Sequence, residues 1–177
     1  MRRTEWEITD LNKIKEIIEN NQCCRLGFID HGSVYIVPLN YGYIYNDKHI
    51  FYFHGAKVGK KIDLIKQNNH VGFEIDNNQL VEGKTSCQYS MKYQSIIGNG
   101  HIELIEDNEE KKLGLQLIMK NVAHQNVTFN DQMVSSVAVM KLTVDTLSCK
   151  EHHWYEESIF NIQPRSTSLP SRYFYAS

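Results

Sequence analysis

The strongest constraint on the fold is a run of three predicted strands between Cys24 and His54 that are separated only by short turns. Asp30–Ser33 and Asn46–Lys48 carry the Asp, Asn, Gly and Ser residues that are typical of tight turns between strands. We expect the strands at residues 24–29, 34–45 and 49–54. Successive strands joined by such short turns run antiparallel, so this run argues against an alternating doubly wound fold.

Helical periodicity marks three other segments of the chain. Apolar residues at spacings of three and four follow a cap at Thr9 or Asp10, and Asn108 is the expected cap of the last helix. The expected helices span residues 11–20, 57–67 and 109–121. The remaining strands are expected at residues 71–75, 93–105 and 137–147, with polar loops at 76–90 and 123–133 and an uncertain strand fragment at 79–81.

Two of the expected strands contain residues that disturb regular pairing. Pro38 cannot donate to a β-ladder, so it marks an edge strand, a bulge or a break. Gly98 and Gly100 interrupt the strand at 93–105, as glycines do at a bulge or at a close approach of two backbones. Hairpin-linked strands with three helices beside them predict a mainly β protein, an antiparallel barrel with peripheral helices.

Length and composition narrow the class of protein. The 177 residues suit one domain, which we expect over residues 1–162, followed by an irregular tail at 163–177. The net charge of −2 gives no overall basic field for nucleic acid or an anionic membrane. No apolar run is long enough for a membrane span or a signal peptide. The four cysteines do not form a secreted disulfide framework, so we expect a cytoplasmic setting.

A lysine-rich helix start follows the strand that ends at His54. Lys57, Lys60 and Lys61 are expected in its first turn, where cations oppose the helix dipole unless an anion is bound. Small residues in the preceding turn leave room for a ligand close to the backbone. The pattern favours a phosphate site made of backbone N–H and ammonium groups, and the alternative is an ordinary solvated helix face. The chain contains no P-loop and no G-x-G-x-x-G fingerprint.

Two strand segments are candidates for contacts to a flat heterocycle. Residues 37–41 combine a proline-interrupted strand with an Asn side chain, which together offer hydrogen-bonding groups at the sheet surface. The alternative is an edge strand with a bulge. In the strand at 93–105, Gln94 and Ser95 point to opposite faces, so at most one of them can line a given pocket. Structural packing is the simpler interpretation of the isoleucines that follow.

The segment Cys149-x-x-His152-His153-Trp154 offers possible zinc ligands. It lacks the second matched pair of a zinc-finger spacing, so we favour a polar segment that covers a pocket with Trp154 as an apolar lid. No G-x-S-x-G or H-E-x-x-H motif occurs, and the chain therefore gives no support for a catalytic triad or a zinc protease. We expect no metal site.

Taken in chain order, these segments resemble the flavin-binding split-barrel proteins related to pyridoxamine 5'-phosphate oxidase, and most of all the Nim-type 5-nitroimidazole-resistance branch. The resemblance covers about residues 1–160. It is carried by Met1–Arg3, Ile8–Asp10, Arg25–Phe28, Tyr35–Tyr43, Phe51–Ala56, Gly59–Ile65, Tyr93–Gly98 and Lys150–His153.

The resemblance implies a six-stranded antiparallel split β-barrel that forms a homodimer. FMN, or FAD in some members, would bind in two clefts at the dimer interface, with Lys60 and Lys61 neutralising the phosphate. The histidine that corresponds to His54 lies beside the flavin in the Nim branch, so His54 is the candidate catalytic residue. The family often has Gly where this chain has Cys149, which leaves the local backbone conformation open. The implied cofactor-binding residues are Val37, Pro38, Leu39, Asn40, Tyr41, His54, Gly55, Ala56, Gly59, Lys60, Lys61, Ser95, Ile96, Lys150 and Trp154.

The activity implied by the resemblance is that of a flavin-dependent oxidoreductase. A nicotinamide donor would supply the hydride, and a small electron-poor acceptor such as a nitroimidazole would take the electrons. Oxidation of pyridoxamine phosphate is disfavoured. Its substrate phosphate needs a second basic cluster, and outside residues 57–66 the chain offers only scattered Arg and Lys near the expected pocket. Two alternatives stay open, namely a flavin-binding protein that stores or senses flavin without turnover, and a haem-binding split-barrel protein.

Overall fold

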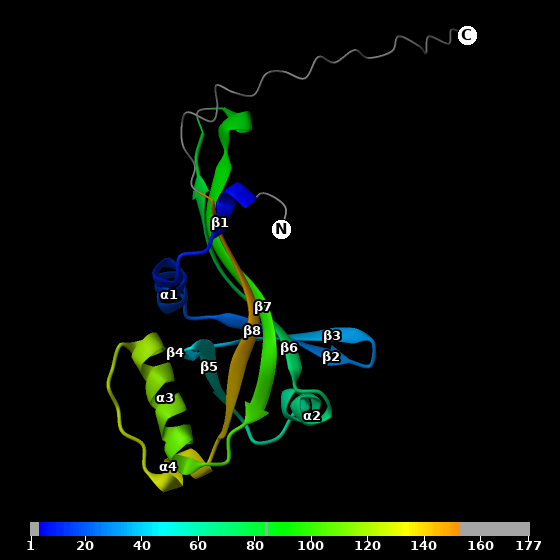
Figure 1. Ribbon diagram of the computed structural model, residues 1–177, viewed down its shortest axis with the longest axis vertical. Coiled ribbons are helices and arrows are strands. Elements are labelled where there is room, and N and C mark those ends of the chain that lie inside the picture. Colours follow the sequence, from blue (N-terminus) through cyan, green and yellow to red (C-terminus); the bar gives the residue numbers. More distant parts are fainter. Residues whose placement is uncertain (1–3, 84, 153–177) are drawn as a thin grey trace, which may run out of the picture.

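The computed structural model describes residues 4–83 and 85–152. Its strands form one antiparallel sheet of eight strands that is bent around a core and not closed (Figure 1). The strand order is β3-β2-β6-β7-β8-β5-β4, and β1 pairs with β8. The strands are β1 (Glu7–Ile8), β2 (Cys24–Asp30), β3 (Ser33–Leu39), β4 (Gly42–Asn46), β5 (Lys48–Gly55), β6 (His70–Val81), β7 (Ser90–Leu104) and β8 (Ala138–His152).

Four α-helices lie against this sheet, namely α1 (Leu11–Glu19), α2 (Lys60–Gln67), α3 (Asn108–Ala123) and α4 (Asp131–Ser135). Short 3-10 turns at Thr4–Trp6 and Ser86–Gln88 complete the described elements. The mainly β split-barrel class expected from the sequence is confirmed, with eight strands in place of six. None of the helices in residues 4–83 and 85–152 has the length and apolar character needed to cross a bilayer.

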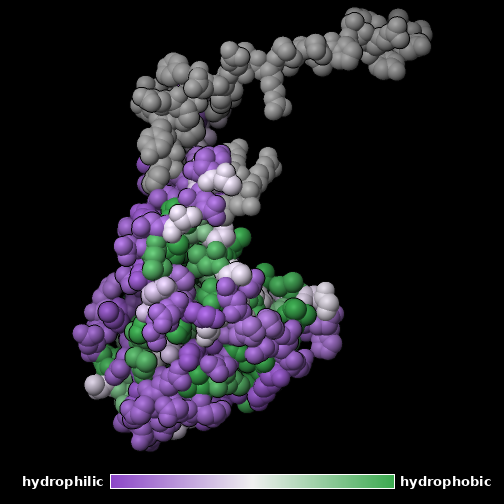
Figure 2. Space-filling model, viewed as in Figure 1, coloured by the Kyte–Doolittle hydropathy of each residue, from purple (hydrophilic) through white to green (hydrophobic). Residues whose placement is uncertain are grey.

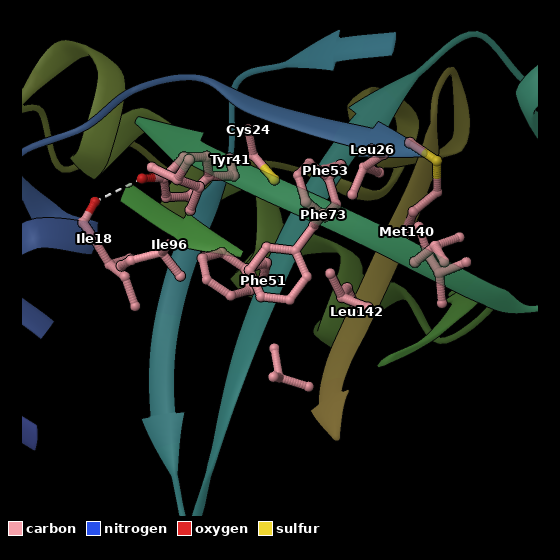
Figure 3. Close-up of a cluster of buried hydrophobic side chains, with 14 of the residues drawn as sticks. Ile18, Cys24, Leu26, Tyr41, Phe51, Phe53, Phe73, Ile96, Met140 and Leu142 are labelled. Carbon is pink, nitrogen blue, oxygen red and sulfur yellow. Dashed lines mark hydrogen bonds between the residues drawn. The ribbon is translucent and has the colours of Figure 1, made fainter. Parts of the chain in front are cut away.

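The main core fills the inner face of the sheet. Large aromatic side chains meet there, and Figure 3 shows Tyr41, Phe51, Phe53 and Phe73 together. The Tyr41 hydroxyl is fully buried and donates a 2.6 Å hydrogen bond to the carbonyl of Ile18 at the end of α1. A buried Tyr41 hydroxyl without a hydrogen-bond acceptor would lower the stability of the fold. The bond to Ile18 therefore holds α1 against the sheet. Apolar residues of α2 join the same core.

A second, smaller core lies between the outer face of the sheet and α3. Tyr52 and Val139 contribute from the sheet, and Leu115 and Ile118 from the helix. The backbones come very close, because a Cβ at Gly42 would lie 2.5 Å from the backbone of Ile118. Only glycine allows β4 to approach α3 so closely.

The structure corrects several expected boundaries in the first half of the chain. The expected strand at 34–45 is two strands, β3 and β4, and the break falls at Asn40–Tyr41. Pro38 stays within β3, which is an edge strand, so its missing N–H leaves no ladder position empty. Helix α2 begins at Lys60, so Lys57 is not in its first turn.

Other corrections concern the second half. Strand β6 continues to Val81 through the expected loop, because it forms a twelve-residue ladder with β7. The cap of α3 is Asp107, whose carboxylate accepts from the Glu110 N–H at 2.8 Å, and not Asn108. Helix α4 occupies part of the expected loop at 123–133, and β8 runs to His152 rather than ending at 147. The bulge at the glycines of β7 is confirmed by a register shift between Asn99 and Gly100.

Candidate functional site

The turn between β5 and α2 is built around two glycines. A Cβ at Gly55 would lie 2.8 Å from both Cε and Nζ of Lys61, so the Lys61 side chain rests where a side chain of residue 55 would be. Gly59 has φ of 127°, a conformation that other residues rarely adopt, and it precedes α2 without any side-chain cap. The first N–H groups of the helix and the Lys61 ammonium are therefore held close to the end of β5.

Lys60 differs from Lys61 in its surroundings. The Lys60 ammonium lies 2.5 Å from a carboxylate oxygen of Asp30 and 5.0 Å from the ring centre of Tyr35. The hydrogen bond from Lys60 holds the pKa of the Asp30 carboxyl below its usual value, and His31 adds to the effect. Within residues 4–83 and 85–152, no carboxylate forms an ion pair with Lys61. Lys61 is thus the more available cation for an external anion.

Most of the segment 37–41 belongs to the core. Val37 and Leu39 pack against the main core, and the Tyr41 side chain is buried in it. Asn40 donates from its amide to the carbonyl of Gln22 at 2.8 Å. Pro38 and Asn40 are exposed. A ligand at this segment would meet Pro38, the Asn40 side chain and backbone groups rather than the side chains of Val37, Leu39 and Tyr41.

His54 and the β7–β8 end also present residues on the outer face. His54 is exposed and follows the core residue Phe53, so its side chain leaves the sheet on the opposite side. Ser95 faces Lys150 across the β7–β8 ladder. Ile96, by contrast, is fully buried, so any contact it makes to a ligand would go through its backbone.

Arg25 lies on the same outer face, between Pro38 and Ser95. It pairs with Pro38 in register and forms ion pairs with Glu74 at 2.8 Å and Asp76 at 2.5 Å. Asp76 in turn pairs with Ser95. Burial raises the pKa of Glu74, and the hydrogen bond from Arg25 opposes this shift. The sequence pattern did not single out this row of charges, because Arg25 lies on β2 and its two partners lie on β6, about fifty residues later in the chain.

Cys149 and His152 lie in different surroundings. The Cys149 thiol is buried in the core, and its burial raises the pKa of the thiol to about 11. The His152 ring lies against Trp6, with Nδ1 2.8 Å from the carbonyl oxygen of Met91. Cys149 pairs regularly with Ile8 and Ile96 and has no positive φ, so the strand tolerates Cys at this position. Trp154 lies outside the described residues.

Two separate pockets of the described residues lie in the two regions that carry the candidate residues. Lys57, Ile62 and Lys66 line a pocket of 220 Å³ beside α2. Another pocket, of 350 Å³, is lined by Gln94 and Glu151 at the other end of the long strands. In Figure 1, α2 lies near the lower end of β7, whereas β1, which pairs with Lys150, lies toward its upper end.

The outer face carries exposed apolar side chains that the sequence analysis left out. Ile29, Val34 and Ile36 are 59–69% exposed on the β2–β3 hairpin, and Ile97 is 55% exposed on β7. Hydrophobic residues reach the surface over the sheet in Figure 2. The signal was present in the sequence, because residues 34–39 are apolar at nearly every position rather than at alternate ones. Such a strand is apolar on both faces.

Comparison with known proteins identifies the family to which the chain belongs. The sequence model of the pyridoxamine 5'-phosphate oxidase family matches residues 10–151 of this chain. The chain belongs to this family. A candidate 5-nitroimidazole antibiotic resistance protein from Bacteroides thetaiotaomicron is 34% identical, with 82% of this chain and 86% of that chain covered and a TM-score of 0.71.

Solved structures with lower sequence identity share the same fold. A flavocytochrome from Azotobacter vinelandii is 16% identical, with 98% of this chain and 91% of that chain covered and a TM-score of 0.70. An FAD- and haem-binding protein from Mycobacterium smegmatis is 13% identical, with 87% and 78% covered and a TM-score of 0.64. At these identities the likeness shows the fold alone. Among curated proteins, none matches the chain significantly.

Proposed function

We propose that this chain is a homodimeric flavin-dependent oxidoreductase that takes a hydride from a nicotinamide donor and reduces small electron-poor acceptors such as nitroimidazoles. The observation that carries the proposal is the 34% identity, over 82% of the chain, to the candidate 5-nitroimidazole antibiotic resistance protein. The flavin would supply the redox chemistry, and the protein would bind it, orient it and shield it from water.

The corner between β5 and α2 fits the phosphate end of a flavin. Gly55 and Gly59 leave the backbone open there, and the Lys61 ammonium lies directly over Gly55. Helix N–H groups together with an ammonium group form a suitable site for a phosphate monoester. FMN, whose phosphate is terminal, is therefore the cofactor that we propose, with FAD as the alternative.

The remaining residues are proposed to border the flavin ring from the outer face. Pro38 and the backbone of its neighbours would flank the ring on one side, and Ser95 and Lys150 would approach from the partner subunit. His54 lies immediately before the Gly55–Ala56 turn and is exposed, so we propose that it holds or delivers a proton near the ring.

A homodimer would complete the site. The exposed apolar residues of β2, β3 and β7 lie on the same face as Pro38 and Ser95. Apolar side chains on an exposed sheet face mark an interaction surface when they lie close together. Pairing two such faces would cover these side chains and bring the β7–β8 end of one subunit toward the β5–α2 corner of the other.

The spectrum of the untagged, purified protein is the first test. We expect the two broad near-ultraviolet and blue absorption bands of a flavin, and a copurifying mass equal to that of FMN or FAD. Under anaerobic conditions, NADH or NADPH should bleach the bands, and a nitroimidazole should restore them. A bound flavin that neither nucleotide bleaches would contradict the reductase and favour flavin storage. One intense Soret band would instead indicate haem.

A further inference from the structure

Three side chains of metal-ligating types meet on the outer face of the sheet, and none of them belongs to the residues proposed to contact the flavin. His70, His101 and Asp145 come from the adjacent strands β6, β7 and β8. Each offers one ligand atom, and these atoms lie within 4.8 Å of one another. We propose that this cluster binds a divalent transition-metal ion, with Zn²⁺ as the probe.

The strand register places the two imidazoles side by side. His70 and His101 are direct cross-strand partners, and their ring centres are 3.9 Å apart. Both are exposed, and neighbouring residues of the same strands, Val71 and Ile102, point into the core. Two histidines in register on one face of a sheet therefore present their nitrogen atoms to the same space.

The β-bulge supplies the carboxylate. In the β7–β8 ladder, Gly100 pairs with Val144 and Asn99 with Thr146, so Asp145 has no partner in register. A bulged residue is turned relative to the regular pleat and can aim its side chain at a neighbouring strand. The Asp145 carboxylate accordingly lies 2.6 Å from Nδ1 of His101. A Cβ at residue 100 would lie 2.2 Å from the carbonyl oxygen of Thr143, so the bulge needs this glycine.

Ligand chemistry selects the type of ion. Imidazole nitrogen suits Zn²⁺, Ni²⁺ and Cu²⁺, whereas Mg²⁺ and Ca²⁺ prefer sites made only of oxygen atoms. At zinc bond lengths of about 2.0–2.2 Å, tetrahedral ligand atoms are roughly 3.3–3.5 Å apart. Because no two ligand atoms are more than 4.8 Å apart, the widest separation must contract by at most about 1.5 Å to reach this geometry, a change within the range of a side-chain rotation for exposed residues. Three protein ligands leave one position for water.

The simpler explanation of the cluster is a hydrogen bond that pins the bulge. It accounts for His101 and Asp145, but it gives no role to His70, whose ring contacts only His101 in the described interactions. Lys48 is the local cation, with its ammonium 3.7 Å from the other carboxylate oxygen of Asp145. Removing Lys48 should therefore strengthen metal binding, whereas the hydrogen-bond explanation predicts no metal binding in either protein.

Calorimetric titration of the untagged, chelator-treated protein with Zn²⁺ tests the proposal. We expect one site per chain, an affinity lowered by roughly 10–100-fold or more in His70→Ala, and a loss of similar size in Asp145→Asn. Co²⁺ should give visible d–d bands in the wild type that are lost in both variants. His31→Ala is the matched control, because His31 also lies near an aspartate, with Nδ1 3.0 Å from Asp30, but outside any such cluster of three.

The His70 variant decides the outcome even if changes at the bulge disturb folding, because the His70 side chain makes no described hydrogen bond. Unchanged Zn²⁺ affinity in His70→Ala would overturn the site, as would an equal loss in His31→Ala. Lys48→Met is expected to bind Zn²⁺ more tightly than the wild type, and weaker binding in that variant would count against the proposed location. Flavin binding should be unaffected in His70→Ala and Lys48→Met.

Discussion

The two faces of the central strands carry apolar side chains for different reasons. On the inner face, Phe51, Phe53 and Phe73 are buried in a continuous aromatic core. On the outer face of the neighbouring strands, Ile36 and Ile97 are more than half exposed and lie beside charged residues. The inner face stabilises the single chain, whereas the outer face is the one that we propose binds a partner subunit and a ligand.

The largest effect is expected on the inner face. Phe53→Ala would remove a fully buried ring that packs near Tyr41, with ring centres 6.5 Å apart. We expect the free energy of unfolding to fall by about 3–5 kcal/mol, because the lost transfer energy and the remaining cavity both contribute. Urea unfolding followed by circular dichroism measures it. A loss below 1 kcal/mol would show that this face is not the structural core.

An outer-face substitution should act on assembly instead. Ile36→Glu places a charge on a 61% exposed position of β3. In the single chain the cost should stay within about 0.5 kcal/mol, whereas a buried, unpaired charge in a dimer interface costs roughly 3 kcal/mol. Sedimentation velocity should show a dimer for the wild type and a monomer for the variant.

The control for that experiment is Leu113→Glu on α3. Leu113 is 40% exposed and lies away from the outer face of β2 and β3. This variant should remain dimeric. Equal dissociation of both variants would remove the distinction between the outer face of β3 and other apolar surface.

Local signals predicted several elements correctly, although the exact start of α2 and the cap of α3 were missed. Helix α1 was expected at 11–20 and is found at Leu11–Glu19, because an aspartate cap and an apolar stripe lie within one segment. The β2–β3 turn and the glycine bulge of β7 followed from local patterns in the same way. The split-barrel class itself came from the ordered resemblance rather than from any single element.

Features fixed by distant residues could not be predicted. The strand fragment expected at 79–81 is confirmed as the end of β6, but the polar residues 76–78 before it have no strand pattern and are held as a strand by their ladder with β7. At the break between β3 and β4, the Tyr41 hydroxyl donates a hydrogen bond to the carbonyl of Ile18, which is distant in the sequence. Lys60 and Lys61 looked equivalent in the sequence, and only the fold places Asp30 beside one of them. A local pattern contains no information about such partners.

The next largest effect is expected at Lys61, in the corner beside the outer face. Lys61→Ala should lower FMN affinity by roughly tenfold to a hundredfold, since a charge-assisted contact is worth about 1.5–3 kcal/mol. Riboflavin, which lacks the phosphate, should bind as it does to the wild type. Fluorescence titration of the apoprotein with both ligands measures the two affinities. An equal loss for FMN and riboflavin would mean that Lys61 has a role other than phosphate binding.

Lys60 should show a smaller effect, because its ammonium is already paired with Asp30 at 2.5 Å. Lys60→Ala removes a cation, but this cation is already the ion-pair partner of Asp30. We therefore expect FMN affinity to fall by less than in Lys61→Ala. The double variant should lose the most. A Lys60→Ala loss as large as that of Lys61→Ala would show that the Asp30 pair opens when FMN binds.

The smallest effect is expected from Asp30→Asn, which separates the two lysines most directly. Without the carboxylate, Lys60 is free to contact the phosphate, and FMN affinity should rise by at most roughly fivefold, because an exposed ion pair is weak. In the wild type, the pKa of Asp30 is lowered, so the pair is fully present above the ordinary carboxyl pKa, persists below it, and is lost as the pH falls through the depressed pKa. The stability that the pair adds disappears over the same acidic range. The variant should therefore differ from the wild type at neutral pH and approach it in acid, and a difference that persists unchanged in acid would rule out competition between Asp30 and the phosphate for Lys60.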